Sequence, residues 1–507
     1  WTPSTLSWDV PTRFRPSLDP NDTNPDYEPR NYDGRFRGPV TVRSALANSY
    51  NIPVVKALEY VHIYDNPETP QADGFINLAR RLGITTLNRP DYGLSLTLGG
   101  GEVSLMELTG AFQVLANEGR KLEPVAITKI VDHTGKLVYE YEPHDGAQIV
   151  RAAHAYLLSS ILSDNVARAP MFGTNSPLNL PFNAAVKTGT TNDFRDNWTI
   201  GYTPELLVGV WVGNADYTPM VNTTGVDGAA PIWNRLMQAG INQFYGGIAS
   251  SFARPNDVVD RIVCSLSGAE PSEYCPSHVT EVFASDQMPL PKDEDLWVRA
   301  QIDSWTNLRS SPACSEFNRE ALTINVSDKF AIEWLETDAG REWARNAGFP
   351  DPLVILPERE CRADDPRPII NLVGIHDGGT VTENPLPIAG VIDATANFKQ
   401  FIIHWGVGHD PDEWHRLTDD WHHEPIRSED LIKEWDLSEM EETLITIRVT
   451  MHSTMNTEVQ KFYRLRLELP TPTPTPTETP TETPTPSPTP ENTPTPPAPQ
   501  EPTVVSP

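Results

Sequence analysis

Cysteine and long apolar runs are scarce in this 507-residue chain, and each shortage argues against a class of structure. The four cysteines, Cys264, Cys275, Cys314 and Cys361, contain no Cys-x-x-Cys pair, which argues against a zinc site. The longest apolar run, residues 206–213, is far shorter than the roughly 20 residues of a membrane-spanning helix. No stretch has the pattern of a signal peptide. We therefore expect no metal, no cofactor and no membrane span here.

Basic residues are also few, since 39 Lys and Arg stand against 69 Asp and Glu, for a net charge of −30. An acidic surface repels phosphate backbones, so we expect no nucleic-acid partner. The chain starts at Trp1 rather than Met, and we expect it to be part of a longer protein whose membrane anchor precedes Trp1.

The four cysteines fit two disulfides in an oxidising compartment better than four reduced thiols, which remain the alternative. We expect Cys264 to pair with Cys275 and Cys314 with Cys361. The order of four cysteines alone leaves three pairings open.

Composition changes divide the second half of the chain. Residues 470–507 are Thr-Pro repeats with almost no apolar side chains, so they cannot form a core and should be a disordered, extended tail. Residues 366–469 contain period-two apolar patterns, as at 399–407 and 445–451, which predict an all-β, Ig-like sandwich. Residues 251–365 hold the cysteines, and we interpret them as a connecting region.

Five histidines gather in this β-rich region and raise the question of a metal site. Their spacings fit no compact ligand motif, so we expect no metal there. They are His404, His409, His415, His422 and His423.

Residues 1–250 combine helical and strand patterns. Helices are predicted at residues 42–49, 105–117, 150–162 and 231–244, the first of them capped by Thr41. The apolar face predicted for the last helix consists of Ile232, Leu236, Ile241 and Phe244.

Three strands are predicted at residues 184–190, 197–202 and 206–213. Their connections have hairpin length, so the strands should be antiparallel neighbours. Residues 1–250 are therefore expected to form an α+β fold with an antiparallel sheet flanked by helices.

The tetrapeptide Lys187-Thr188-Gly189-Thr190 ends the first of these strands. Lys187 puts a positive charge at the edge of the sheet, and Gly189 allows a ligand backbone to approach closely. Thr188 and Thr190 alternate along the strand, so their hydroxyls share a face. Together these residues predict a carboxylate-binding strip, although the tetrapeptide alone also arises by chance.

A second polar motif, Ser49-Tyr50-Asn51, follows the first predicted helix. A hydroxyl and an amide at a helix end can position a substrate and pass protons. By itself the motif is equally a polar C-terminus of a helix.

The order of the two motifs and their surroundings resemble the bifunctional class of penicillin-binding proteins, over about residues 1–244. Ser-x-Asn before Lys-Thr-Gly is the order of the second and third motifs of that family. The matching strings are residues 30–34, 38–53, 98–104, 187–197 and 201–204.

This resemblance implies a serine acyl-transfer site. Ser49 matches the serine that relays a proton, Asn51 the amide that holds the substrate backbone, and Lys187 the lysine that bonds this serine. Thr188 and Thr190 match the hydroxyls that bind the terminal D-alanine carboxylate or a penicillin, and the Thr190 N–H matches half of an oxyanion hole.

The sequence departs from the family in one motif. None of its ten lysines follows a serine by three residues, so the Ser-x-x-Lys that carries the nucleophile is absent. We expect that motif, and a glycosyltransferase domain, before Trp1, and an open groove with an apolar wall in this chain. The resemblance implies a D,D-transpeptidase outside the cytoplasm that acts on D-Ala-D-Ala stem peptides and binds β-lactams. The alternatives are a non-catalytic penicillin-binding sensor and a structural cell-wall protein.

Overall fold

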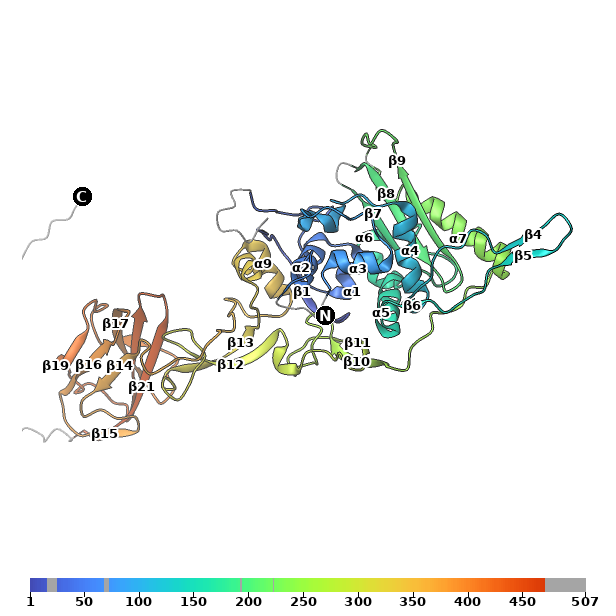
Figure 1. Cartoon of the computed structure of the whole chain (residues 1–507). Coiled ribbons are helices and arrows are strands. Elements are labelled where there is room, and N and C mark those ends of the chain that lie inside the picture. The colour runs from blue at the N-terminus through green and yellow to red at the C-terminus, as the bar shows by residue number, and fades with distance from the viewer. Residues whose placement is uncertain (16–24, 68–72, 192–193, 222, 470–507) are drawn as a thin grey trace, which may run out of the picture. The chain divides into compact units, whose positions relative to one another are not determined.

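The computed structural model describes residues 1–15, 25–67, 73–191, 194–221 and 223–469 (Figure 1). The chain forms two compact units, one of Trp1–Arg367 with Met455–Val459 and one of Pro368–Thr454 with the chain from Gln460. The tail predicted at residues 470–507 lies outside the described residues.

An antiparallel sheet of strands β7 (Ala185–Thr190), β8 (Asp196–Tyr202) and β9 (Leu207–Gly213) is central to the first unit. Its order, β7-β8-β9, confirms the predicted neighbours, and each strand begins or ends within one residue of the prediction. This order leaves β7 at an edge of the sheet.

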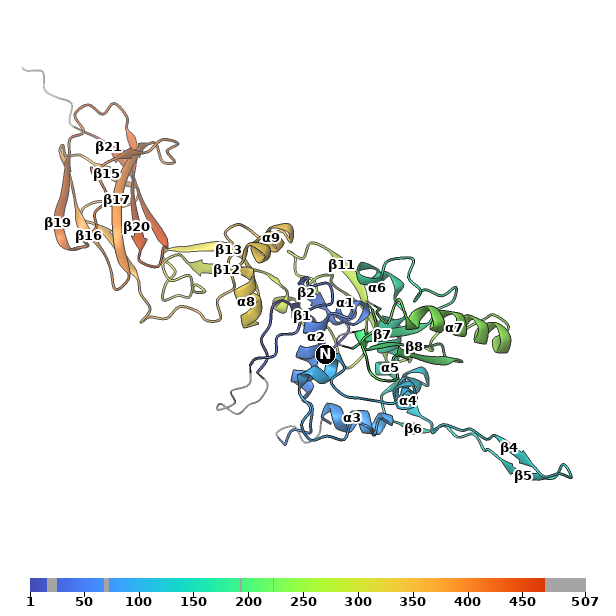
Figure 2. The ribbon, with the colours of Figure 1, turned by 90° about the horizontal axis from the view of Figure 1, so that it is seen from above.

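Helices cover both faces of this sheet, as Figures 1 and 2 show. Ala185 and Tyr202, paired across β7 and β8, pack on the side of α4 (Leu105–Ala116) and α5 (Ala152–Leu162). Val186 and its partner Gly201 face α7 (Ala229–Tyr245). The predicted α+β layers are therefore present, because alternate residues of each strand face opposite helices.

The face that α7 buries was predicted wrongly. Ile232, Leu236 and Phe244 are 46%, 50% and 69% exposed, and of the predicted face only Ile241 is buried. The helix instead buries Trp233, Met237 and Ile241, which follow one another at four-residue spacing. Trp233 lies over Gly201, where a Cβ atom would stand 2.5 Å from the indole ring. The deciding contact is thus a glycine in another element, which periodicity within the helix cannot reveal.

The remaining elements before residue 250 surround this core. Helix α1 is N-capped by Thr41, as predicted. The helices are α1 (Val42–Asn48), α2 (Asn51–Val61), α3 (Phe75–Leu82), α6 (Asn165–Phe172) and the 3-10 turn η1 (Leu94–Leu98). The short strands are β1 (Leu6–Asp9), β2 (Gly38–Thr41), β3 (Arg120–Lys121), β4 (Lys129–Val131), β5 (Leu137–Glu140) and β6 (Ala147–Gln148).

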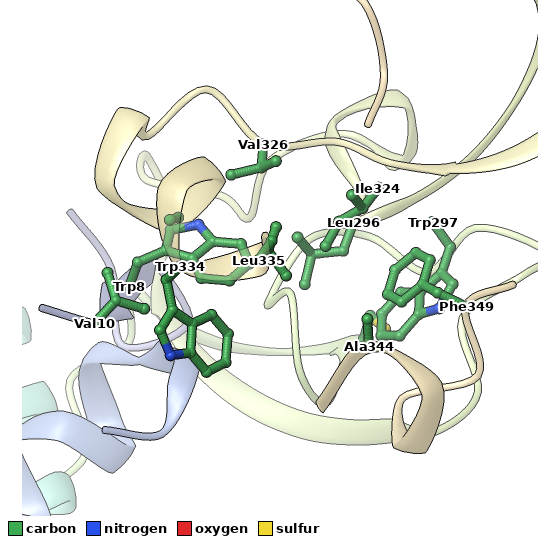
Figure 3. Packing of buried hydrophobic residues seen from close by; sticks show 12 residues of the cluster. Trp8, Val10, Leu296, Trp297, Ile324, Val326, Trp334, Leu335, Ala344 and Phe349 are labelled. Carbon is green, nitrogen blue, oxygen red and sulfur yellow. The ribbon is translucent and has the colours of Figure 1, made fainter. Parts of the chain in front are cut away.

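The connecting region packs into the same unit. Its elements are β10 (Val258–Cys264), β11 (His278–Ala284), η3 (Lys292–Glu294), β12 (Trp297–Asp303), β13 (Asn318–Ile324), α8 (Lys329–Leu335) and α9 (Asp338–Asn346). Figure 3 shows Trp8 of β1 beside Trp334 of α8, with their ring centroids 6.5 Å apart. Trp297 stacks on Phe349 at 5.2 Å in the same cluster. Burial of these large rings joins the connecting region to the N-terminal strand.

Both expected cysteine pairs are present. Cys264 is bonded to Cys275 and Cys314 to Cys361, with Cα–Cα distances of 5.9 and 6.5 Å. These distances lie within the range that a disulfide spans.

The part of the second unit before residue 470 contains two sheets. One has the order β14-β16-β19 and the other β15-β21-β20-β17-β18. The predicted face of β20, which holds Ile445, Ile447, Val449 and Met451, is fully buried. The strands are β14 (Pro368–Leu372), β15 (Gly379–Val381), β16 (Leu386–Ala394), β17 (Phe398–Val407), β18 (His415–Arg416), β19 (Ile426–Trp435), β20 (Leu444–Ser453) and β21 (Glu458–Leu467).

Two of its histidines lie against aromatic rings, His422 stacked and His415 tilted. His422 lies 4.7 Å from Phe401 and His415 lies 4.9 Å from Trp405, centroid to centroid. Among the described residues, the one cluster with metal-ligand geometry is Cys264, Cys275 and Asp295, and both of its sulfur atoms are in a disulfide.

An ion pair ties helix α1 to the connecting region. Arg43 binds both carboxylate oxygens of Glu281 at 2.6 Å, and its side chain is only 17% exposed. Replacing Glu281 with alanine leaves this guanidinium with one carboxylate, Asp164 at 3.3 Å, and with the neutral carbonyl and hydroxyl of Ser160. We expect the unfolding free energy to fall by about 3 kcal/mol, because the charge stays buried without its main partner.

Urea unfolding of the Glu281→Ala variant measures this loss. The control is Glu320→Ala, which removes the exposed pair with Arg299 on the neighbouring hairpin and should change stability little. Equal effects from the two variants contradict the assigned role of Glu281.

Candidate active site

Helix α1 places Ser49 at its C-terminal end. Ser49 has φ 59° and ψ 42°, a left-handed conformation that residues other than glycine rarely adopt. The chain turns there, so that α2 begins two residues later at Asn51. Strained backbone at a polar residue is common at functional sites.

Lys187 on the edge strand β7 reaches this serine, although 138 residues separate the two. Its Nζ donates to Ser49 Oγ at 2.7 Å and to the carbonyl of Thr188 at 2.7 Å. The Nζ–Oγ distance agrees with the roughly 3 Å hydrogen bond predicted from the sequence. The fold therefore brings the Lys-Thr-Gly motif into contact with the Ser-x-Asn motif, as the sequence predicts.

The threonines and glycine of the motif continue along β7. Thr190 Oγ1 accepts a hydrogen bond from the Gly225 N–H at 3.0 Å and keeps its own hydroxyl proton for another acceptor. A Cβ atom on Gly189 would come no closer than 3.4 Å to another residue, at Trp198. The protein's own packing therefore does not require glycine at position 189.

Asn51 is held at two points by the segment before β2. Its backbone N–H donates to Asn31 Oδ1 at 2.7 Å, and its Nδ2 donates to the carbonyl of Arg30 at 2.6 Å.

One cavity of about 830 Å³ joins all six residues predicted for the site, Ser49, Asn51, Lys187, Thr188, Gly189 and Thr190. Its walls include a large apolar part, to which Leu46, Leu96, Leu108 and Phe112 contribute. This part agrees with the apolar groove expected from the sequence. Trp211 also lines the cavity, and its Nε1 is fixed by Asp196 at 2.9 Å.

The electrostatics of the cavity centre on Lys187. Burial, together with the positive charge of Arg168, lowers the pKa of Lys187 to about 8. Arg168 lies on α6, is buried itself and bonds to the carbonyls of Leu162 and Asp164, and burial lowers its pKa to about 10. No carboxylate contributes to the shift of Lys187, so its ammonium presents a positive charge to an anionic ligand in a cavity that Glu102 and Asp196 also line.

Sequence reasoning missed Arg168 and Asn31. Arg168 follows Asp164 by four residues, a spacing typical of an exposed ion pair on a helix, and nothing in the sequence shows that it is buried. Asn31 belongs to a string that matched the family, but no role was assigned to it. The place of that string, shortly before the Ser-x-Asn motif, was the signal that could have indicated a role for Asn31 at the site.

Comparison with known proteins agrees with this geometry. Residues 14–238 match the penicillin binding protein transpeptidase domain. Penicillin-binding protein 1A of Clostridium tetani is 30% identical over 271 residues, covering 52% of this chain and 33% of that protein. Penicillin-binding protein 1A of Aquifex aeolicus is 34% identical over 232 residues, covering 44% and 29%.

Among solved structures, penicillin-binding protein 1A from Haemophilus influenzae matches with a TM-score of 0.47 and 20% identity, covering 57% of this chain and 46% of that one.

A lysine of Lys-Thr-Gly bonded to the serine of Ser-x-Asn brings together the second and third motifs of penicillin-binding proteins and related β-lactamases. Residues 14–238 belong to the transpeptidase domain family of the penicillin-binding proteins. The chain spans about a third of the length of the curated relatives it matches. None of the helices in the described ranges has the length and apolar character needed to cross a membrane.

Proposed function

We propose that this chain is the transpeptidase part of a bifunctional penicillin-binding protein that cross-links peptidoglycan stem peptides in the bacterial cell envelope. The observation that carries the proposal is the 2.7 Å bond between Lys187 Nζ and Ser49 Oγ in a cavity that also holds Asn51, Thr188 and Thr190. The same site binds β-lactams in place of the peptide.

The reaction is an acyl transfer through a serine ester. A serine attacks the carbonyl of the penultimate D-alanine, the bond to the last D-alanine breaks, and that D-alanine leaves with the proton of the serine hydroxyl. An amine of a neighbouring peptide then attacks the ester and forms the cross-link, and the serine regains a proton.

Each residue of the cavity has a part in these steps. The hydroxyls of Thr188 and Thr190 bind the terminal carboxylate in the positive field of Lys187, and Asn51 holds the peptide backbone. Ser49, bonded to Lys187, relays the proton between the attacking serine and the leaving amine. The backbone N–H of Thr190 stabilises the oxyanion.

The attacking serine comes from a Ser-x-x-Lys segment outside these 507 residues. None of the ten lysines here follows a serine by three positions, and the chain spans about a third of its relatives. The apolar part of the cavity, with Leu46, Leu108 and Phe112, is the surface on which that segment packs. The longer protein carries the glycosyltransferase domain and the membrane anchor, and the second unit is an appended Ig-like sandwich.

The test uses the chain extended upstream through its Ser-x-x-Lys, called the extended chain below. Incubated with a stem peptide that ends in D-Ala-D-Ala, it should release D-alanine and join the peptide to an added amine acceptor. Chromatography of the products measures both. If a fluorescent penicillin labels the extended chain but no D-alanine is released, the chain is a penicillin-binding sensor and the transpeptidase assignment is wrong.

A further inference from the structure

Asn31 forms an unusually complete set of hydrogen bonds beside the site. Its Nδ2 donates to both carboxylate oxygens of Asp9 at 2.8 Å and to the carbonyl of Arg35 at 2.7 Å. Its Oδ1 accepts the backbone N–H of Asn51 at 2.7 Å. Asn31 is 4% exposed and Asp9 is fully buried, so water does not compete for these bonds.

The bond to Asn51 supplies a missing helix cap. Asn51 is the first residue of α2, and the N–H groups of a first helical turn have no partner within the helix. Tyr50, at the N-cap position, makes no side-chain capping bond. Asn31 therefore caps α2 from a segment 20 residues away.

Two consecutive residues, Arg30 and Asn31, thus hold Asn51 by its side chain and by its backbone. Because Arg30 takes one N–H of the Asn51 amide, the rotation of that amide is fixed, and its remaining N–H and its oxygen are left for a ligand.

Asp9 in turn orients Asn31. A carboxylate accepts but does not donate, so it binds the Nδ2 side of the amide and leaves Oδ1 to face Asn51. Arg37 supports Asp9, because its backbone N–H donates to Asp9 Oδ2 at 3.2 Å and its guanidinium lies 3.9 Å from the same oxygen. The guanidinium also lies 4.2 Å from the centroid of the Tyr50 ring. The other charged group near the pair is Asp33, which binds Arg37.

We propose that Asn31, oriented by Asp9, is a positioning residue that fixes Asn51 for acyl transfer; this role rests on the function proposed above. The relay runs from the Asp9 carboxylate through the Asn31 amide to the backbone of Asn51. Its effect is on the geometry of Asn51, since neither Asp9 nor Asn31 lines the cavity.

Exchanging the two side chains tests the relay. Asn31→Asp puts two carboxylates against each other, and a displaced Asn51 should lower the rate of penicillin acylation of the extended chain about 100-fold. In the double variant D9N/N31D, the new asparagine donates to the new aspartate, which again accepts the Asn51 N–H. The bond to the Arg35 carbonyl, one of the two bonds between residues 9 and 31, and the 3.9 Å ion pair of Asp9 with Arg37 are lost, so the rate should recover in part, to within about tenfold of the natural chain.

Hydrogen–deuterium exchange of the 507-residue chain gives a readout that needs no acylation. Asn31→Asp should speed exchange at the Asn51 amide, and D9N/N31D should slow it again. The proposal is overturned if Asn31→Asp leaves the acylation rate unchanged. It is also overturned if the D9N/N31D chain folds but neither regains a faster acylation rate nor slows the exchange of the Asn51 amide. If the natural extended chain is not acylated at all, the proposed function fails, and the exchange measurement still decides whether the relay holds Asn51.

Discussion

Replacing Lys187 with alanine in the extended chain is expected to lower the rate of penicillin acylation about 100- to 1,000-fold, the effect of removing one preorganised donor from an acyl-transfer site. The variant loses the 2.7 Å bond to Ser49 and the positive charge of the cavity. Ser49 then has no partner to fix its hydroxyl for proton relay. Stopped-flow acylation with a fluorescent penicillin measures the rate.

Lys129 provides a matched control for this variant. It lies exposed on β4 and pairs with Glu140 at 3.7 Å, so Lys129→Ala removes a positive charge from the same domain without touching the cavity. Its acylation rate should equal that of the natural chain. If Lys187→Ala acylates as fast as Lys129→Ala, Lys187 has no part in the reaction.

The pH dependence of the same reaction reports the charge of Lys187. Burial and Arg168 lower the pKa of Lys187 to about 8, so the ammonium is present below that pH and is lost as the pH rises through it. Binding of a carboxylate-bearing ligand should therefore weaken above about pH 8. In a Lys187→Arg variant the charge persists, because arginine stays protonated, and this weakening should disappear. If ligand binding weakens equally above about pH 8 in the natural chain and in the Lys187→Arg variant, the loss of the Lys187 charge is not the cause.

The sequence allowed the two motifs and the sheet that joins them to be predicted, because both depend on local patterns. Short strand-forming segments joined by connections of hairpin length predicted the sheet around Lys187, and Thr41 marked the start of the helix that ends at Ser49. The order of Ser-x-Asn and Lys-Thr-Gly then indicated that both motifs belong to one binding site, and both line one cavity in the structure.

Features that depend on tertiary contacts could not be predicted in this way. The buried face of α7 is set by Gly201 beneath Trp233, a contact between elements that periodicity does not encode. The burial of Arg168 beside Lys187 and the relay from Asp9 to Asn51 likewise join segments far apart in the chain.

The second large effect concerns the nucleophile. The 507-residue chain should form no covalent adduct with penicillin, whereas the extended chain should. Lys187 and the threonines bind and polarise a ligand, but Ser49 is not followed three residues later by the lysine that activates the attacking serine in this family. Its own partner Lys187 has a pKa of about 8 and is mostly a protonated donor at neutral pH. Loss of the nucleophile removes the covalent path, and a binding strip with an oxyanion hole leaves only weak residual catalysis.

Mass spectrometry of both chains after incubation with penicillin tests the central claim, that this chain holds the binding and polarising part of a penicillin-binding site and that the attacking serine lies outside it. The account predicts no mass increase for the 507-residue chain and, for the extended chain, a single adduct that peptide mapping places on the serine of Ser-x-x-Lys. An adduct on Ser49, or on any other serine of the 507 residues, would contradict it.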